Sequence, residues 1–481
     1  MDMTPDDFPT SAYIGGTWVT SKDQFAVINP ATGLDIARVP NLTPADARRA
    51  IDAASSALAE WSAKTAKERA AVLRRWYDLI LAESEALAQL MTAEQGKPLA
   101  ESRGEVAYGA SFVEWFAEEG KRAYGRTIPT TASTKRYITI KQPIGVVAAI
   151  TPWNFPIAMI TRKVAPALAA GCTIIVKPAE DTPLCALALA KLAEKAGVPA
   201  GVFNVVTTQD ARGVGEVLCA DGRVRKLTFT GSTEVGKILY RQCADTVKKL
   251  TLELGGNAPL IIFDDADLDQ AVAGAMASKY RNAGQTCVCA NRIIVQAGIY
   301  DRFASALAAA AEKLVVGPGA TAGVNLGPLI NAEAVAKVES LIADAVAKGG
   351  TVKTGGAKDA AGSLFYKPTV LTGVTADMDI VSQEIFGPVA ALIKFETDEE
   401  AIALANNTPF GLAAYLFSQN IHRAWKAAEK LEAGMVGVNE GIFSNEVVPF
   451  GGVKESGLGR EGAAEGLEEY LETKFICLGG M

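Results

Sequence analysis

From Pro143 onward, short apolar runs alternate with helical patterns, and no other feature of the chain constrains its fold as strongly. Uninterrupted apolar runs of this length are typical of strands buried on both faces of a parallel sheet. One helical pattern, over 157–170, 183–196, 213–220 and 234–243, follows each of the predicted strands Ile144–Ile150, Cys172–Lys177, Val202–Val206 and Lys226–Thr230. The alternation therefore predicts a doubly wound, Rossmann-like α/β unit.

A second β-α series begins after Gly255-Gly256. Its predicted strands lie near 259–263, 292–296, 413–418 and 435–439, and its predicted helices lie near 267–282, 299–313, 331–347 and 421–432. The Gly- and Ala-rich stretch 350–362 predicts a loop. Three helices are expected between Thr43 and Gly120, the second of them over 66–92. A chain of 481 residues is long enough for more than one such domain.

Charge and cysteine usage exclude several classes of partner. The net charge of -7 argues against nucleic-acid binding, which favours a basic face. No run of 18 apolar residues predicts a membrane span, and the acidic N-terminus lacks the apolar core of a signal peptide. The seven cysteines are odd in number and scattered, so no disulfide framework is expected and a reducing cytoplasm fits best.

The chain contains a single histidine, His422, in a probable helix start. One histidine argues against a Ser-His-Asp or Cys-His hydrolase. It also rules out a zinc site built on several histidines, and Cys287-Val-Cys289 lacks Cys-x-x-Cys spacing, so no metal site is expected. A general base in this protein is therefore expected to be a carboxylate.

The segment Arg281-Asn-Ala-Gly-Gln-Thr-Cys287 lies between a helical pattern and a strand-like run. A thiol on such a loop can act as a nucleophile, or it can be a small buried apolar residue, and the local sequence leaves both readings open. Two other motifs add matching chemistry beside Gly and Pro turn signals. Glu253 in Leu252–Gly256 offers a base, and Asn154 in Thr151–Pro156 offers an amide donor.

These three motifs resemble those of the NAD(P)-dependent aldehyde dehydrogenase superfamily, and the resemblance runs from about residue 10 to the C-terminus. Among the branches of the superfamily, the chain is most similar to succinate-semialdehyde dehydrogenases. The resemblance implies an α/β fold with a Rossmann-like dinucleotide-binding domain, a second α/β catalytic domain and a small β oligomerisation arm. The expected boundaries are 1–123 with 145–252, then 253–445, and finally 124–144 with 446–481 for the arm and C-terminal segment.

The resemblance also implies the chemistry. Cys287 would attack the aldehyde carbon, and the Asn154 amide with the Cys287 backbone N–H would hold the oxyanion. Hydride loss would leave a thioester, and Glu253 would activate the water that releases the acid. Glu253 favours hydrolysis over transfer of the acyl group to coenzyme A, because branches that use coenzyme A typically lack this base. Lys163 matches a further active-region lysine.

The resemblance also implies that Trp153, Gly231, Ser232, Glu384 and Phe386 bind the cofactor, and the chemistry of the strand end at 177–180 adds Lys177 and Glu180. Gly231 and Ser232 open a helix whose N-terminus favours a phosphate, although a plain strand-to-helix turn would look the same. Glu180 follows a strand and would accept hydrogen bonds from the adenosine ribose while repelling a 2′-phosphate. NAD is therefore expected, and NADP remains possible because Lys177 could pair with that phosphate.

Arg162, Arg281 and Ser444 match residues that bind the distal carboxylate in succinate-semialdehyde dehydrogenases. Arginine binds carboxylates through two parallel hydrogen bonds, although each arginine could instead pair with a local acidic residue. The substrate loop 440–449 leaves glutarate semialdehyde, a ketoglutarate semialdehyde and sulfolactaldehyde open as alternatives to succinate semialdehyde. A non-catalytic relative of the family is disfavoured by the joint presence of Cys287, Glu253 and Asn154.

The alternating segment Arg136–Lys141 and the strand-like segment Leu471–Leu478 are expected to form the oligomerisation arm of a homodimer or homotetramer. The spacing of Cys287 and Cys289 further suggests that this pair forms a reversible disulfide, as some related enzymes do.

Overall fold

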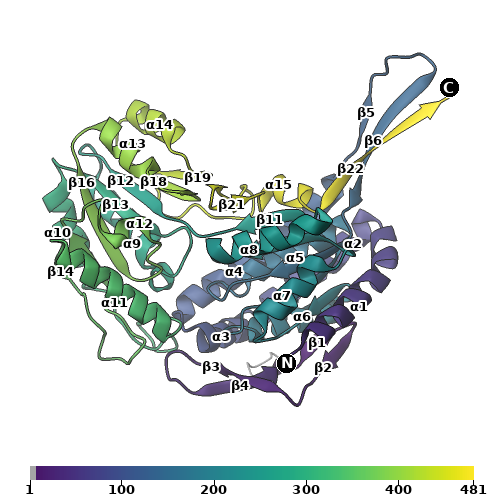
Figure 1. Cartoon of the computed structure of the whole chain (residues 1–481), viewed down its shortest axis with the longest axis horizontal. Helices are drawn as coiled ribbons and strands as arrows, with labels where there is room; N and C mark the ends of the chain where they lie inside the picture. The colour runs from purple at the N-terminus through teal and green to yellow at the C-terminus, as the bar shows by residue number, and fades with distance from the viewer. Residues whose placement is uncertain (1–6) are drawn as a thin grey trace.

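The computed structural model describes residues 7–481, so the first six residues of the expected dinucleotide-binding segment 1–123 lie outside the described residues. Two α/β sheets lie side by side, and a narrow β arm projects from the first (Figure 1). This arrangement confirms the predicted fold class, a Rossmann-like unit followed by a second α/β unit.

The first sheet has the strand order β2-β1-β9-β8-β7-β10-β11-β21. Its five central strands are parallel and their order reverses beside β7, as in a dinucleotide-binding fold. The strands are β1 (Ala12–Ile14), β2 (Thr17–Val19), β7 (Val146–Ile150), β8 (Thr173–Lys177), β9 (Phe203–Val205), β10 (Val224–Thr230), β11 (Lys249–Glu253) and β21 (Gly457–Leu458). β21 belongs to the predicted C-terminal segment 446–481, so that segment contributes to this sheet as well as to the arm.

Helices cover both faces of the first sheet, because its central strands are apolar throughout. One face carries α5 (Ala158–Ala170) and α6 (Leu184–Ala196), with α2 (Ala66–Ala82), α3 (Ser84–Gln95) and α4 (Leu99–Glu119) packed behind them. The other face carries α1 (Pro44–Ala63), α7 (Ala211–Ala220) and α8 (Thr233–Cys243). The single helix predicted over 66–92 is wrong, because the chain breaks at Glu83 into α2 and α3.

The second sheet has the order β14-β15-β16-β13-β12-β18-β19. Its strands are β12 (Ala258–Ile262), β13 (Ala290–Gln296), β14 (Thr351–Thr354), β15 (Thr369–Thr372), β16 (Val389–Phe395), β18 (Ala413–Phe417) and β19 (Met435–Val438). Its helices are α9 (Leu268–Tyr280), α10 (Tyr300–Ala311), α11 (Ala332–Ala347), α12 (Asp379–Ser382), α13 (Asp398–Asn406) and α14 (Ile421–Lys430). The loop predicted over 350–362 contains β14, whose pairing with β15 gives this polar stretch a partner.

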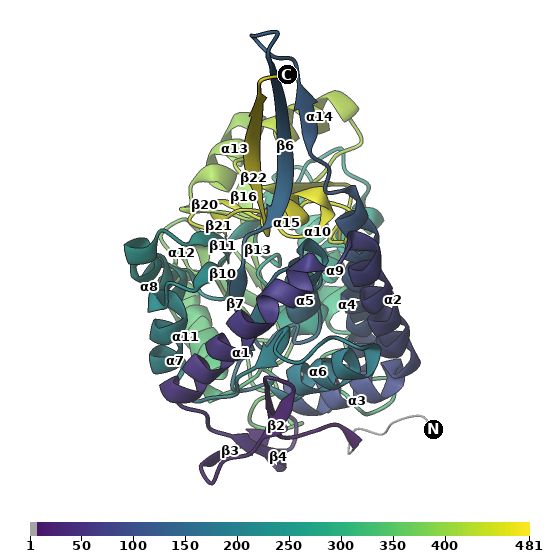
Figure 2. The same ribbon diagram turned by 90° about the vertical axis from the view of Figure 1, so that its right-hand side faces the viewer.

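The arm is a three-stranded antiparallel sheet with the order β22-β6-β5. It brings together β5 (Arg126–Ile128), β6 (Lys135–Pro143) and the C-terminal β22 (Leu471–Gly479), which follows α15 (Ala463–Glu468). Figure 2 shows the arm extending away from both α/β units. Two short hairpin-like pairs complete the fold: β3 (Gln24–Ile28) with β4 (Asp35–Pro40), and β17 (Phe410–Gly411) with β20 (Val453–Lys454).

Candidate active site

The carboxyl ends of three parallel strands of the first sheet place most of the predicted residues at one edge. β7 leads into Trp153 and Asn154, β10 ends at Thr230 just before Gly231, and β11 ends at Glu253. Thr230 pairs directly with Glu253 across the sheet. Ligands of open α/β sheets bind outside this edge, where the strand order reverses.

The second sheet contributes the thiol. Cys287 lies on the loop between α9 and β13, so it sits at the amino end of β13. Asn282 has a φ of 50°, and Gly284 has a φ of 75° at a point where a Cβ atom would lie 2.1 Å from the Gly387 carbonyl oxygen. A Cβ atom on Gly256 would lie 2.4 Å from the Cys287 carbonyl oxygen. Tight backbone packing therefore fixes the position of the loop that carries Cys287.

A cavity of about 280 Å³ lies where the two units meet. Eight residues singled out in the sequence line it together, and they are Trp153, Asn154, Gly231, Ser232, Glu253, Cys287, Glu384 and Phe386. The other six lie outside its lining, and they are Arg162, Lys163, Lys177, Glu180, Arg281 and Ser444. Sequence reasoning missed Lys337 of α11, a cationic lining residue that no motif marked.

The electrostatics at the thiol favour its neutral form. Burial raises the pKa of Cys287 to about 12, and the nearby Arg162 only partly opposes this rise. Burial also raises the pKa of Glu253 well above its ordinary value, and the neighbouring carboxylate of Glu461 adds to the effect. Neither oxygen of Glu253 has a hydrogen-bond partner among residues 7–481. A buried carboxyl without partners, beside a half-buried thiol, is suited to proton transfer.

A buried cluster of charges lies next to Glu253. Glu461 pairs with the Nε of Arg162 and with the Nζ of Lys163, and all three side chains are almost fully buried. Arg162 also stacks over the ring of Phe450 at 4.3 Å. The two cations lower the pKa of Glu461 despite its burial. Arg162 therefore does pair with a local acidic residue, which was the alternative to substrate binding. Its Nη1 and Nη2 atoms nevertheless have no hydrogen-bond partner among the described residues.

Arg281 is half-buried, and its charge is close enough to Glu101 to lower the pKa of that carboxyl group against the effect of burial. It stacks over the Phe155 ring at 5.4 Å, and no acidic group of residues 7–481 forms an ion pair with it. Tyr108, another residue that sequence reasoning missed, has a buried hydroxyl without a partner in the described chain. Burial raises the pKa of Tyr108, and Arg162 and Arg281 oppose that rise, so the three groups lie near one another. Ser444 is half-buried on the substrate loop.

The cofactor residues fit a dinucleotide on structural grounds. Ser232 caps α8, its hydroxyl accepting from the Val235 N–H at 3.3 Å, and the N-terminus of α8 faces the cavity through Gly231. Glu384 accepts from the Gly256 N–H at 3.0 Å, and burial raises the pKa of Glu384 to about 7. A Cβ atom on Gly255 would lie 3.1 Å from the Glu384 carboxylate, so a side chain at this position would crowd Glu384.

Aromatic and charged groups complete this region. Trp153 and Phe386 meet edge to face with ring centroids 5.6 Å apart. Lys177, at the end of β8, is buried and pairs with the half-exposed Glu180 at 3.1 Å. An ion pair of this kind needs no cofactor to explain it. The pair nevertheless leaves the Glu180 carboxylate accessible at the end of β8.

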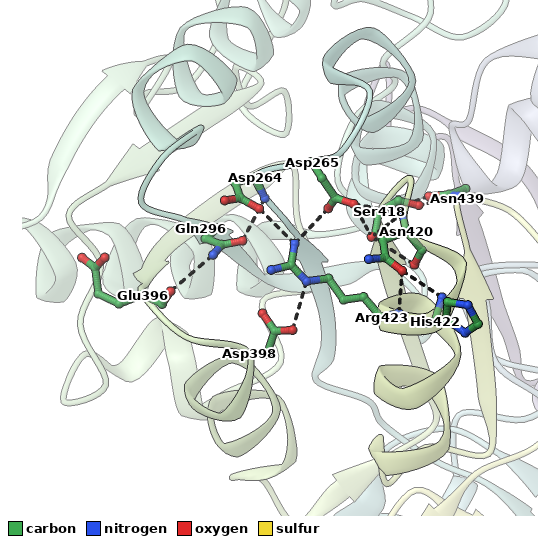
Figure 3. A network of polar contacts seen from close by, with 10 residues as sticks. All are labelled: Asp264, Asp265, Gln296, Glu396, Asp398, Ser418, Asn420, His422, Arg423 and Asn439. Carbon is green, nitrogen blue, oxygen red and sulfur yellow. Dashed lines mark hydrogen bonds and ion pairs between the residues drawn. The ribbon is translucent and has the colours of Figure 1, made fainter.

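The remaining cysteine and histidine motifs lie apart from this chemistry. Cys289 accepts from the Thr286 hydroxyl at 3.0 Å, and both Cys287 and Cys289 are free thiols, so the disulfide hypothesis stays a prediction. His422 does not line the cavity. Figure 3 shows it at the start of α14, beside a network in which Arg423 contacts Asp264, Asp265 and Asp398.

No helix among residues 7–481 combines the length and apolarity that crossing a bilayer requires. Over the same residues, no three His, Cys, Asp or Glu side chains are grouped so that they could hold a metal ion.

Comparison with known proteins identifies the family. The model of the aldehyde dehydrogenase family matches residues 18–476. The chain is 59% identical to a 3-sulfolactaldehyde dehydrogenase of Pseudomonas putida over 99% of this chain and 98% of that one. It is 58% identical to the NADP(+) succinate-semialdehyde dehydrogenase GabD of Escherichia coli strain K12, over 98% of each chain. A crystal structure of succinate-semialdehyde dehydrogenase from Burkholderia pseudomallei superposes with a TM-score of 0.98 at 59% identity, over 99% of each chain. The chain therefore belongs to the aldehyde dehydrogenase family, and it is an NAD(P)-dependent aldehyde dehydrogenase.

Proposed function

We propose that this enzyme oxidises a short anionic aldehyde, succinate semialdehyde in the first place, to the free acid. The observation that carries the proposal is a pair of guanidinium groups with unused donors near the thiol. Both Nη atoms of Arg162 are buried without partners, and Arg281 has no ion pair within the described chain. Leaving a buried charged donor unsatisfied is costly, so such a site favours a ligand that brings an anion.

In this proposal Cys287 forms a bond to the aldehyde carbon as its thiol proton is removed. Because the pKa of Cys287 is high, a base must take that proton, and Glu253 lines the same cavity. The carbonyl oxygen becomes an oxyanion, which the Asn154 amide and the Cys287 backbone N–H stabilise. One such donor typically contributes about 100- to 1000-fold in rate.

The chemistry that NAD(P) supplies when bound is acceptance of the hydride that the adduct loses. The residues that would hold the cofactor are Gly231, Ser232, Glu384 and Phe386. After Glu253 has released the thiol proton to solvent, it takes a proton from water, whose oxygen attacks the acyl carbon and expels the Cys287 thiolate. The high pKa of Glu253 suits a base that must exchange protons near neutral pH.

The second candidate is another acid-bearing aldehyde. The 59% identity to an enzyme named for 3-sulfolactaldehyde supports a sulfonate as strongly as the 58% identity to GabD supports a carboxylate. Glutarate semialdehyde and a ketoglutarate semialdehyde have the same anionic end. The guanidinium groups of Arg162 and Arg281, with the half-buried Ser444, suit each of these anions.

For the cofactor we propose a preference for NAD. The accessible carboxylate of Glu180 would repel the 2′-phosphate of NADP, although its partner Lys177 could soften that repulsion. The preference is measured as the ratio of kcat/KM values for NAD and NADP, and a ratio at or below one contradicts it. The free thiols support the cytoplasm as the compartment.

Initial rates of NADH formation with succinate semialdehyde, glutarate semialdehyde, sulfolactaldehyde and neutral butanal test the proposal. The wild type, Arg281→Ala and the exposed-surface control Arg212→Ala are compared. We expect an acidic aldehyde to lead and Arg281→Ala to lose about 10-fold or more of that lead, with butanal unaffected. If another acid leads, the class stands and the named substrate is wrong. Equal rates with butanal, unchanged in Arg281→Ala, would overturn the anionic pocket.

A further inference from the structure

A buried ion pair outside the cavity touches the backbone of Asn154. Lys97 lies in the turn between α3 and α4, and Glu105 lies on α4. Their side chains are each 1% exposed, and the Lys97 Nζ lies 2.5 Å from the Glu105 Oε2. Neither residue lines the cavity, and the mechanism above does not use them. Burying two charges is expensive unless further hydrogen bonds satisfy both.

Those further hydrogen bonds all go to the segment that carries Asn154. The Lys97 Nζ donates to the Asn154 carbonyl oxygen at 2.7 Å and lies 4.0 Å from the centre of the Phe155 ring. The Glu105 Oε1 accepts from the backbone N–H groups of Ile157 at 2.9 Å and Ala158 at 3.2 Å, at the start of α5. The pair therefore clamps the Asn154 backbone and the helix start that follows it.

The loop that carries the thiol grips Asn154 from the other side. The Asn282 Nδ2 donates to the same Asn154 carbonyl oxygen at 3.0 Å, and the Asn154 Nδ2 donates to the Gln285 carbonyl oxygen at 3.0 Å. Gln285 is itself fixed, because its Oε1 accepts from the Ile330 N–H at 2.9 Å. The Asn154 amide thus bridges the two units, and one of its N–H groups remains for a ligand in the cavity.

We infer that Lys97 and Glu105 are positioning residues that hold the Asn154 amide where the oxyanion forms. This inference rests on the proposed function, which gives Asn154 the role of oxyanion donor. A shift of about 1 Å in such a group can cost about 100-fold in rate without changing substrate binding. Loss of the pair is therefore expected to lower kcat while KM changes little.

The chain offers a matched control in Glu94. Its carboxylate is also fully buried and also caps a helix, accepting from the Leu184 N–H at 2.8 Å and the Cys185 N–H at 2.9 Å. That helix is α6, whose start does not carry Asn154. Glu94→Gln therefore removes a buried capping carboxylate at comparable structural cost, without releasing the Asn154 segment.

Two assays report on the oxyanion donor, and one needs no cofactor. Hydrolysis of 4-nitrophenyl acetate by the Cys287 thiol passes through an oxyanion without NAD(P). NADH formation with succinate semialdehyde reports the full reaction. Glu105→Gln is expected to lower kcat about 10- to 100-fold in both assays, whereas Glu94→Gln stays within about 2-fold. Circular dichroism confirms that the variants are folded at the assay temperature.

A double-mutant cycle separates positioning from general damage. In an Asn154→Ala background, Glu105→Gln is expected to cost less than about 2-fold, since the amide that it positions is already gone. Equal losses in both backgrounds, or a Glu105→Gln enzyme as active as the wild type, would overturn the inference. A wild-type enzyme that hydrolyses the ester but forms no NADH with any acidic aldehyde would instead refute the proposed function. In that case the double-mutant cycle measured by ester hydrolysis would still decide whether Lys97 and Glu105 position Asn154.

Discussion

Glu253 shows what the site demands of a single residue. Its carboxyl group is 2% exposed and has no hydrogen-bond partner within residues 7–481, although Arg162 and Lys163 lie close enough to oppose the rise in its pKa. Such a group destabilises the folded chain when it ionises, because burial removes the water that would solvate the charge. A residue kept in this state is more useful for proton transfer than for stability.

Glu253→Gln is expected to lower kcat about 100- to 10,000-fold, because the side-chain amide of the variant cannot take a proton from water. The same change is expected to raise stability. The folded pKa lies above the ordinary value of 4.5, so wild type is most stable below that pH and loses stability as pH rises through the folded pKa. Urea denaturation at pH 5 and pH 8 measures this effect. The variant should gain more over wild type at pH 8, and a gain that is equal or smaller at pH 8 contradicts the account.

At the scale of elements, the site depends on how closely two turns approach. The turn after β11 passes under the loop between α9 and β13, and Gly256 lies against the Cys287 carbonyl oxygen. The φ of Gly256 is not in the left-handed region, so the requirement for glycine here is one of space. Backbone packing between the two sheets therefore constrains the position of the thiol.

Gly256→Ala is expected to displace Cys287 and to lower kcat/KM about 10-fold or more, with a loss of stability of about 1–3 kcal/mol. The control is Gly104→Ala on the exposed side of α4, where a Cβ atom meets nothing within 4 Å. That change should leave activity intact and stabilise the helix by up to about 1 kcal/mol. Titration of Cys287 with iodoacetamide, alongside the aldehyde assay, reports whether the thiol has moved. Full activity in Gly256→Ala would contradict this prediction, because it would mean that the loop accommodates the added methyl group without displacing Cys287.

The same scale shows what the sequence could and could not predict. The strands β7, β8, β9 and β10 were predictable because their apolar runs are buried on both faces. β11, whose end carries Glu253, was missed, because Lys249–Glu253 alternates polar with apolar residues. β16 was missed, although its residues Val389–Phe395 are equally apolar, because no regular alternation precedes it. Lys97, Glu105 and Tyr108 could not be assigned, since nothing in a local pattern indicates a contact with Asn154 or with Arg162. The roles of the eight cavity residues remain predictions.

At the scale of the whole molecule, the arm exposes a strand edge that is not paired within the described chain. β22 pairs on one side with β6 over nine residues, and its other edge has no strand beside it within the described chain. Phe475 is 58% exposed and Leu478 is 40% exposed. An unpaired edge with apolar side chains favours pairing with another chain. This supports the prediction that the enzyme is a homo-oligomer, a dimer or a tetramer.

The double variant Phe475→Asp/Leu478→Asp is expected to reduce the mass of the assembly, because charged side chains oppose burial at a chain–chain contact. Light scattering after size-exclusion chromatography measures the mass in multiples of the 50.4 kDa chain. Trp425→Asp is the control, since Trp425 is 65% exposed but lies on α14. An unchanged mass in the arm variant would place the subunit contact elsewhere.

In the proposed mechanism, Cys287 carries the acyl group of an acidic aldehyde and Glu253 releases it. The most direct measurement mixes Glu253→Gln enzyme with succinate semialdehyde and NAD, follows NADH, and locates bound acyl groups by peptide mass spectrometry. This mechanism predicts about one NADH per chain, formed slowly because the thiol proton must pass to water without Glu253, followed by a stall, and a succinyl group on the peptide that contains Cys287. NADH formed with no acyl group on Cys287, or an acyl group on Cys289 instead, would contradict it.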